Sequence, residues 1–132
     1  ASADEALVVT TPHLSAIRDA DKVIKLIKSY EIKKISVVLN RVRGDKEYSG
    51  ETITAADVSE MLGVSVAGVV PEDDGINALS SLSEPCKKRS DGYRATELLC
   101  RNIHFGSGAI YDAQRKYRGL FGGIKRRMRK IV

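Results

Sequence analysis

The sequence ISVVL at residues 35–39 is a short, nearly unbroken run of apolar and β-branched side chains. Two similar runs lie on either side of it, ALVVTT at residues 6–11 and VSVAGVV at residues 64–70. A strand with one face in water alternates apolar and polar residues, whereas an unbroken apolar run is typical of a strand covered on both faces. The three runs therefore predict three buried β-strands.

The segments between these runs have the spacing of helices. Apolar residues recur every three or four positions between the first two runs, after Pro12, a residue that suits an early helix position. They are Leu14, Ile17, Ala20, Ile24 and Ile27. Between the second and third runs, Thr54 and Asp57 resemble a capping box, and Gly63 is well placed to end the helix.

Strands that alternate with helices pair in parallel through right-handed crossovers, so we predict an α/β fold with a doubly wound parallel sheet. A further helix is expected over residues 92–103, with Ser90 and Asp91 as candidate caps. Three strands are few for a sheet buried on both faces, because the outer strands would expose apolar side chains and unpaired edges. The chain is therefore expected to form half of a larger sheet.

The charge of the chain is concentrated at one end. The 132 residues include 22 bases and 17 acids, a net charge of +5. Eight of the bases and no acid lie between Arg115 and Val132, which leaves 14 bases against 17 acids in residues 1–114. A basic segment on an acidic body needs its own explanation. We divide the chain into a body at residues 1–104, a linker at 105–116 and a basic segment at 117–132.

The apolar residues of the basic segment fall on one stripe of a helix. They are Tyr117, Leu120, Phe121, Ile124, Met128 and Ile131. Bases that include Lys125, Arg126 and Arg127 lie largely on the flanks and the opposite side. This pattern is typical of a helix in a bilayer interface, with its bases toward anionic headgroups. Because three glycines and the like charges oppose helix formation, we expect disorder in water and folding on contact with the membrane.

The alternative explanation of the basic segment is an arm that binds nucleic acid. Phosphates are tracked by charge alone and require no apolar stripe, so an anionic membrane surface is the favoured partner and nucleic acid is not expected. No apolar run reaches the ~18 residues that a spanning helix needs, and the N-terminus lacks the residue order of a signal peptide. These observations predict an intracellular protein that is at most peripheral to a membrane.

Other kinds of site chemistry have little support in the sequence. Cys86 and Cys100 lack the spacing of a zinc or redox motif, which indicates reduced bystander thiols. His13 and His104 have no partner at ligand spacing, and local spacing suggests neither a Ser-His-Asp triad nor a glycosidase pair. The chain contains no phosphate-binding loop of the form G-x-x-x-x-G-K-[ST]. No catalytic or metal-ligating set is therefore predicted.

Several segments, taken in order, carry a family resemblance. They are ADEA at 3–6 with VVTTP at 8–12, SAIRDAD at 15–21, VLNRV at 38–42, ADV at 56–58 with MLG at 61–63, GVVPED at 68–73 and GLFGGIKR at 119–126. In this order they resemble the second half of the MinD family within the MinD and ParA superfamily of deviant Walker ATPases, and the resemblance covers essentially the whole chain. It implies the C-terminal half of a doubly wound sheet followed by an amphipathic membrane-targeting tail.

The resemblance also implies an ATP-dependent, membrane-associated regulator of bacterial division-site placement. The phosphate and Mg²⁺ sites of that family precede the first strand seen here, so this chain is not expected to hydrolyse ATP alone. Asn40 and Arg41 would lie beside the adenine, where an amide matches a base edge and a guanidinium can stack on the base. Pro71, Glu72 and Asp73 would form the other wall of the pocket. From the residues alone, Asn40 equally suits a turn cap, and the acidic pair suits a helix start.

Partners are implied as well. Four residues on the polar side of the first predicted helix would meet a MinC-like division inhibitor, near the contact of an ATP-dependent homodimer: Ser15, Arg18, Asp19 and Asp21. From the residues alone they read as a solvated charged face. A MinE-like regulator would be a second partner, and the expected location is the bacterial cytoplasm at the inner face of the membrane. A ParA-like partitioning ATPase, a regulator of flagellar number and a nonenzymatic basic-tailed module that binds nucleic acid remain alternatives.

Overall fold

The structure is a computed structural model that describes residues 3–76, 90–119 and 121–131. Its strands are β1 (Glu5–Thr10), β2 (Lys34–Val42) and β3 (Ser65–Pro71). Its helices are α1 (Leu14–Ser29), α2 (Gly44–Tyr48), α3 (Ala55–Leu62), α5 (Asp91–Phe105), the 3₁₀ turn η1 (Arg115–Tyr117) and α6 (Gly122–Ile131). The predicted alternation of strands and helices is confirmed.

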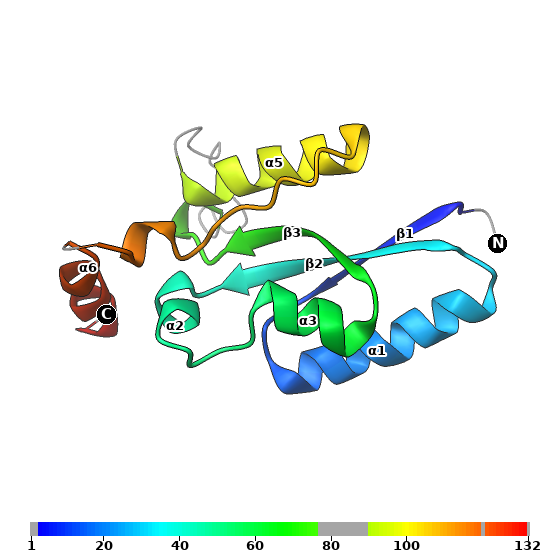
Figure 1. Cartoon of the computed structure of the whole chain (residues 1–132), viewed down its shortest axis with the longest axis horizontal. Helices are drawn as coiled ribbons and strands as arrows, with labels where there is room; N and C mark the ends of the chain where they lie inside the picture. Colours follow the sequence, from blue (N-terminus) through cyan, green and yellow to red (C-terminus); the bar gives the residue numbers. More distant parts are fainter. Residues whose placement is uncertain (1–2, 77–89, 120, 132) are drawn as a thin grey trace.

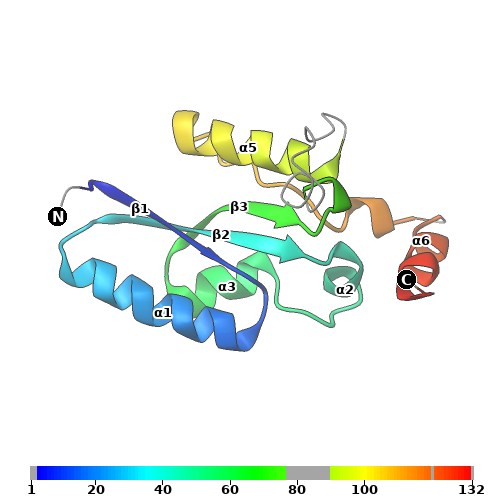
Figure 2. The same cartoon turned by 180° about the vertical axis from the view of Figure 1, so that it is seen from behind.

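The three strands form one parallel sheet in the order β1-β2-β3. Helices α1 and α3 cover one face of this sheet and α5 covers the other (Figure 1). The view from behind shows the same layers, with α6 beyond the carboxyl ends of β2 and β3 and far from the N-terminus (Figure 2). The predicted α/β class and parallel pairing are therefore confirmed.

The largest part of the core lies between the sheet and α1 with α3. Ile17 and Ile24 of α1 are each 1% exposed, and they pack with Val37 and Leu39 of β2 and with Val58 of α3. The apolar spacing of α1 predicted the buried residues Ile17, Ala20 and Ile24 correctly, whereas Leu14, placed on the same side, is 48% exposed. Pro12, expected early in the helix, instead lies before it, because α1 begins at Leu14.

Local capping signals were accurate guides to helix ends. Thr54 and Asp57 form the predicted capping box at the start of α3, and Gly63 ends that helix in the left-handed conformation at φ 61°. The Ser90 hydroxyl accepts a hydrogen bond from the Tyr93 N–H and so caps α5. These motifs bond only within a few residues of sequence, so the rest of the fold changes them little.

The outer side of β1 is open. The strand pairs with β2 on one edge, and the described part of the chain places no strand on the other. Its side chains Leu7 and Val9 are 43% and 60% exposed, on the side of the sheet that bears α5. Apolar side chains beside an unpaired edge are what the sequence predicted for half of a larger sheet.

The basic segment is not one continuous helix. Tyr117 belongs to η1 and is only 2% exposed, and Gly119 has φ 88° between η1 and α6. A left-handed residue interrupts helical spacing, so the prediction that Tyr117 shares the apolar stripe is wrong. Leu120 and the side chain of Ile131 lie outside the described residues. Phe121, Ile124 and Met128 remain, and we call these three the exposed stripe because they are 76%, 58% and 63% exposed.

Candidate functional site

The carboxyl ends of β2 and β3 bring charged side chains together. In open α/β sheets this edge is where ligands bind. The Glu72 carboxylate lies 3.4 Å from a guanidinium nitrogen of Arg41 and 4.0 Å from Nε of Arg43. A cavity of about 350 Å³ opens here, and its lining includes the loop after β1, Arg41, Arg43, Lys46 and Glu72. We call it the carboxyl-edge site.

The backbone at Asn40 and Arg41 has an unusual conformation at this edge. Arg41 has φ 58°, a left-handed conformation that non-glycine residues adopt rarely and that is found disproportionately at functional sites. The Asn40 Oδ1 accepts a hydrogen bond of 2.9 Å from the Arg41 N–H. Asn40 lies within β2, where the pairing with β3 is irregular between Leu39 and Val42, so its side chain supports the left-handed backbone of Arg41 inside the strand.

The residues after β3 divide between structural support and the site. Pro71 is buried and pairs with Val42. Glu72 anchors its own backbone by donating its N–H to the Val42 carbonyl at 3.0 Å. The Asp73 carboxylate accepts hydrogen bonds from the N–H groups of Gly75 at 2.7 Å and Gly92 at 2.6 Å. Asp73 thus caps the start of α5, and Glu72 alone of the three directs charge toward the arginines.

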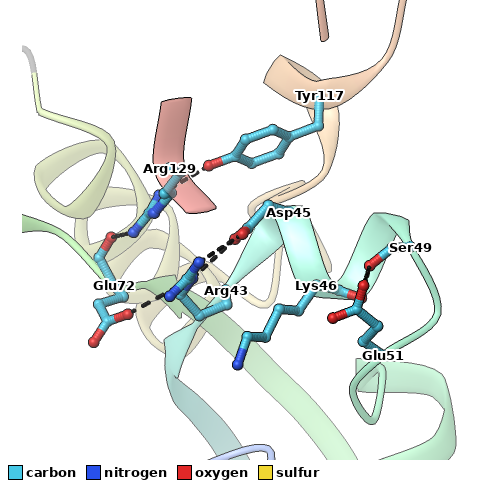
Figure 3. A network of polar contacts seen from close by, with 8 residues as sticks. All are labelled: Arg43, Asp45, Lys46, Ser49, Glu51, Glu72, Tyr117 and Arg129. Atoms are coloured by element: carbon cyan, nitrogen blue, oxygen red, sulfur yellow. Dashed lines mark hydrogen bonds and ion pairs between the residues drawn. The ribbon is translucent and has the colours of Figure 1, made fainter. Parts of the chain in front are cut away.

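Sequence reasoning missed Arg43 and Asp45. Arg43 donates two hydrogen bonds to the Asp45 carboxylate, at 2.9 and 2.6 Å (Figure 3). These bonds lower the pKa of Asp45 although its burial acts in the opposite direction. Strand alternation could not have located Arg43, because β2 ends at Val42 and Arg43 begins the turn into α2. The ion pair itself depends on the short helix α2 and could not be read from spacing.

These residues fit one wall of a nucleotide site and no more. Arg41 has a side chain that is 66% exposed and paired with Glu72 at 3.4 Å, a guanidinium is a group that can stack on a planar base, and the adjoining cavity is lined by several cations. The chain contains no glycine-rich lysine loop to hold phosphates. Among residues 3–76, 90–119 and 121–131, no group of three or more His, Cys, Asp or Glu side chains is placed to hold a metal ion.

The tail helix α6 contacts this same edge. Arg129 donates one hydrogen bond to the Tyr117 hydroxyl at 2.8 Å and another to the Glu72 carbonyl at 3.2 Å (Figure 3). The guanidinium of Arg126 lies 4.7 Å from the centre of the Tyr48 ring. Lys125 and Arg127 are exposed. Helix α6 thus meets the body through basic side chains and leaves the exposed stripe in solvent.

The four predicted partner-binding residues lie on the outer side of α1. Ser15, Arg18 and Asp19 are exposed, and Asp21 is half-buried. Asp19 pairs with Lys22 at 3.0 Å and Asp21 with Lys25 at 2.6 Å, both within the same helix. The structure places these residues on the solvent-facing side of α1, which follows directly on the loop that lines the carboxyl-edge site. No helix in the described part has the length and apolar content that crossing a membrane requires.

Comparison with known proteins identifies the relatives. No protein-family model matches the chain. The septum site-determining protein MinD of Synechocystis is 33% identical over 131 residues, which are 97% of this chain and 49% of that protein. A putative septum site-determining protein MinD of Chlorella vulgaris is 41% identical over 124 residues, 92% of this chain and 44% of that one. The chain thus spans about half the length of the curated relatives it matches.

Solved structures give the same result. MinD of Aquifex aeolicus superposes with a TM-score of 0.73 at 28% identity, covering 77% of this chain and 44% of that one. The MinC:MinD complex from Aquifex aeolicus gives 0.72 at 28% identity over 77% and 43%. MinD from Pyrococcus horikoshii with Mg-ADP gives 0.67 at 27% identity over 81% and 44%. The chain belongs to the MinD family of septum site-determining proteins and corresponds to a C-terminal part of them.

Proposed function

We propose that the chain is the C-terminal part of an ATP-dependent, membrane-associated regulator of division-site placement. In this role it supplies one wall of an adenine pocket, a surface for partner proteins and a membrane anchor. The phosphate and Mg²⁺ sites belong to the part of the family that the chain does not span. Binding of ATP would switch the assembly from one state to another. This chain would supply the groups around the adenine base and the attachment to lipid.

The observation that carries the proposal is the exposed stripe. Ile124 and Met128 of α6, and Phe121 just before it, are each more than half exposed, next to the exposed bases Lys125 and Arg127. A helix that binds nucleic acid needs the bases and gains nothing from large apolar side chains in water. A helix at a bilayer interface uses both, because the apolar groups enter the acyl boundary and the bases meet anionic headgroups. The arrangement therefore favours a membrane.

The nucleotide role is supported by the family and by the carboxyl-edge site. A MinD structure has been solved with Mg-ADP, and 81% of the present chain superposes on the fold of that protein. Asn40, Arg41 and Glu72 lie together at the sheet edge where such a ligand would be met. We propose that Arg41 stacks on the adenine and that the backbone of residues 71–73 faces its edge.

Protein partners follow from the same family. MinD of Aquifex aeolicus has been solved in complex with MinC, and we propose a MinC-like inhibitor as a partner of the outer side of α1. A MinE-like regulator and a homodimer in the ATP state complete the proposed assembly. Two tails held in one dimer would bind lipid with an effective concentration that multiplies the affinity of one tail by about 10²–10⁴. Its place would be the bacterial cytoplasm, at the inner face of the membrane.

Vesicle co-sedimentation of the 132-residue chain tests the anchor. We expect binding to phosphatidylglycerol vesicles and a loss of roughly tenfold or more in affinity for Phe121→Glu, because a buried phenylalanine contributes about 1.5–3 kcal/mol. Phe105→Glu is the matched control, since Phe105 is 75% exposed, as Phe121 is 76% exposed, but lies at the end of α5. Undiminished binding of Phe121→Glu, or binding of duplex DNA without binding of vesicles, would refute the proposal.

A further inference from the structure

The segment between α5 and η1 has no regular secondary structure, yet part of it is buried. After Phe105 the chain turns back and runs along α5 to the carboxyl ends of β2 and β3, where it forms η1 (Figure 1 and Figure 2). Ala113 and Tyr117 are 5% and 2% exposed. We call residues 109–117 the strap. Connecting segments normally lie on the surface, so the burial of the strap is explained only by what it contacts.

The strap packs on the wall of the carboxyl-edge site that follows β2. Gly44, the first residue of α2, lies so close to the strap that a β-carbon there would collide with the Ala113 carbonyl. Gly44 is flanked by Arg43 and Asp45, which form an ion pair across it. Because Arg43 lines the cavity, the strap holds the backbone that carries a residue of the site.

The strap is also tied to the wall that follows β3. The Lys116 ammonium donates a hydrogen bond of 2.6 Å to the Asp91 carboxylate, and the two side chains are only 37% and 29% exposed. Burial and a hydrogen bond to Asp91 raise the pKa of the Tyr111 hydroxyl in the strap. Asp91 is the first residue of α5, and the next residue, Gly92, donates its N–H to the Asp73 carboxylate at 2.6 Å. The strap is thus linked through the start of α5 to the loop after β3.

At the site the two strands are joined less regularly than along their length. The pairing of β2 with β3 shifts between Leu39 and Val42, and the Glu72 N–H bonds to the Val42 carbonyl at 3.0 Å. Between side chains, the Glu72 carboxylate lies 3.4 Å from Arg41 and 4.0 Å from Arg43. The strap contacts both walls and can therefore set the distance between them.

We infer that the strap clamps the two walls of the carboxyl-edge site at a fixed separation, with Lys116 as a positioning residue that acts through Asp91. Neither Lys116 nor Gly44 is among the residues that line the cavity, so each acts through the residues that it holds. Supporting contacts of this kind keep binding groups within about 0.5 Å of their working positions. The inference deepens the proposed function and rests on it only for the identity of the group bound between the walls.

The experiment asks whether a change at one attachment of the strap loosens both walls. Lys116→Met keeps an unbranched apolar side chain and removes the ammonium. Lys116→Arg keeps the charge and a donor that reaches Asp91, so it is the conservative variant. Arg115→Met is the matched control, because Arg115 is an exposed base in the same turn. Backbone amide exchange is measured on the 132-residue chain without ligand or vesicles.

One amide reports on each wall. The Glu47 N–H bonds to the Arg43 carbonyl at 2.9 Å, and the Glu72 N–H bonds to the Val42 carbonyl. We expect Lys116→Met to raise both exchange rates by about fivefold, because a partly buried charged hydrogen bond is lost. Lys116→Arg should restore most of the protection, and Arg115→Met should change neither rate. Residues 35–39 of β2 should remain better protected than either wall, which checks the fold.

Faster exchange of Glu72 alone in Lys116→Met would mean that the ion pair supports α5 only, and it would overturn the inference. An equal increase in Arg115→Met would do the same. Gly44→Ala tests the opposite attachment: a β-carbon there displaces the strap, so the Gly92 N–H on the other wall should also exchange faster, and an unaltered rate would contradict the clamp. A parent chain that does not bind vesicles would refute the proposed anchor, and the exchange rates would still decide the clamp.

Discussion

Helices α1 and α6 are both amphipathic, and the fold uses them in opposite ways. Helix α1 presses its apolar side onto the sheet, where Ile17 and Ile24 are each 1% exposed, and turns its charges to solvent. Helix α6 contacts the body with Arg126 and Arg129 and turns Met128 to solvent, 63% exposed. The contrast teaches that an apolar stripe predicts an apolar contact without saying whether that contact lies inside the protein or outside it.

The contrast between the two helices is tested most directly by placing a carboxylate on the apolar side of α1 and on the apolar side of α6. Ile24→Asp puts a charge into a fully packed position, so we expect a loss of roughly 4 kcal/mol or more in the free energy of unfolding. Met128→Asp changes a side chain that is 63% exposed and should alter the stability by no more than about 0.5 kcal/mol. Urea denaturation measures both. A comparable loss in the two variants would mean that α6 buries its apolar side as α1 does.

Two adjacent glycines in α6 offer a finer test. Alanine favours a helix over glycine by about 1 kcal/mol, so propensity alone predicts that Gly122→Ala and Gly123→Ala both order α6. A β-carbon on Gly122 would collide with the Tyr117 carbonyl, whereas one on Gly123 meets nothing nearer than 3.9 Å. We therefore expect faster amide exchange of α6 in Gly122→Ala and slower exchange in Gly123→Ala. Slower exchange in both would show that α6 does not depend on its contact with η1.

The smallest expected effect on stability is on the outer side of α1. Asp19→Lys removes an exposed ion pair with Lys22, so the free energy of unfolding should change by less than about 0.5 kcal/mol. Binding to a MinC-type inhibitor, measured by pull-down, should nevertheless be abolished. Glu60→Lys, which reverses an exposed acid on α3, serves as the control and should still bind. Retained binding by Asp19→Lys would remove this surface from the proposed assembly.

The sequence was most informative where structure depends on neighbours in the chain. Apolar runs located three strands, and the caps Thr54, Gly63 and Ser90 located helix ends, because these features arise from local packing and local hydrogen bonds. The parallel pairing of the strands followed from the alternation of strands and helices. The family resemblance supplied Arg41 and Glu72 as members of two walls of one pocket, and the ion pair between them shows that they lie close together at the sheet edge.

Other features depend on contacts between distant segments and could not be predicted. Tyr117 was assigned to the wrong surface because nothing in the spacing reveals that the backbone turns at Gly119. Arg129 was counted as one more base, although its partners lie 12 and 57 positions away in the chain. The spacing of residues in the sequence predicts which of them share one face of a helix. What packs against that face is known only from the folded structure.

The long side of β1, with which no strand among the described residues pairs, has a consequence for handling the protein. A strand whose outer N–H and C=O groups meet water is a template on which another extended segment can form hydrogen bonds. Leu7 and Val9 would add apolar contact for any such segment. At high concentration, two copies of the chain are therefore expected to pair through the open edge of β1. A polypeptide that supplies the next strand would cover this edge and reduce such association. Solubility should then depend on what is produced alongside the chain as much as on buffer.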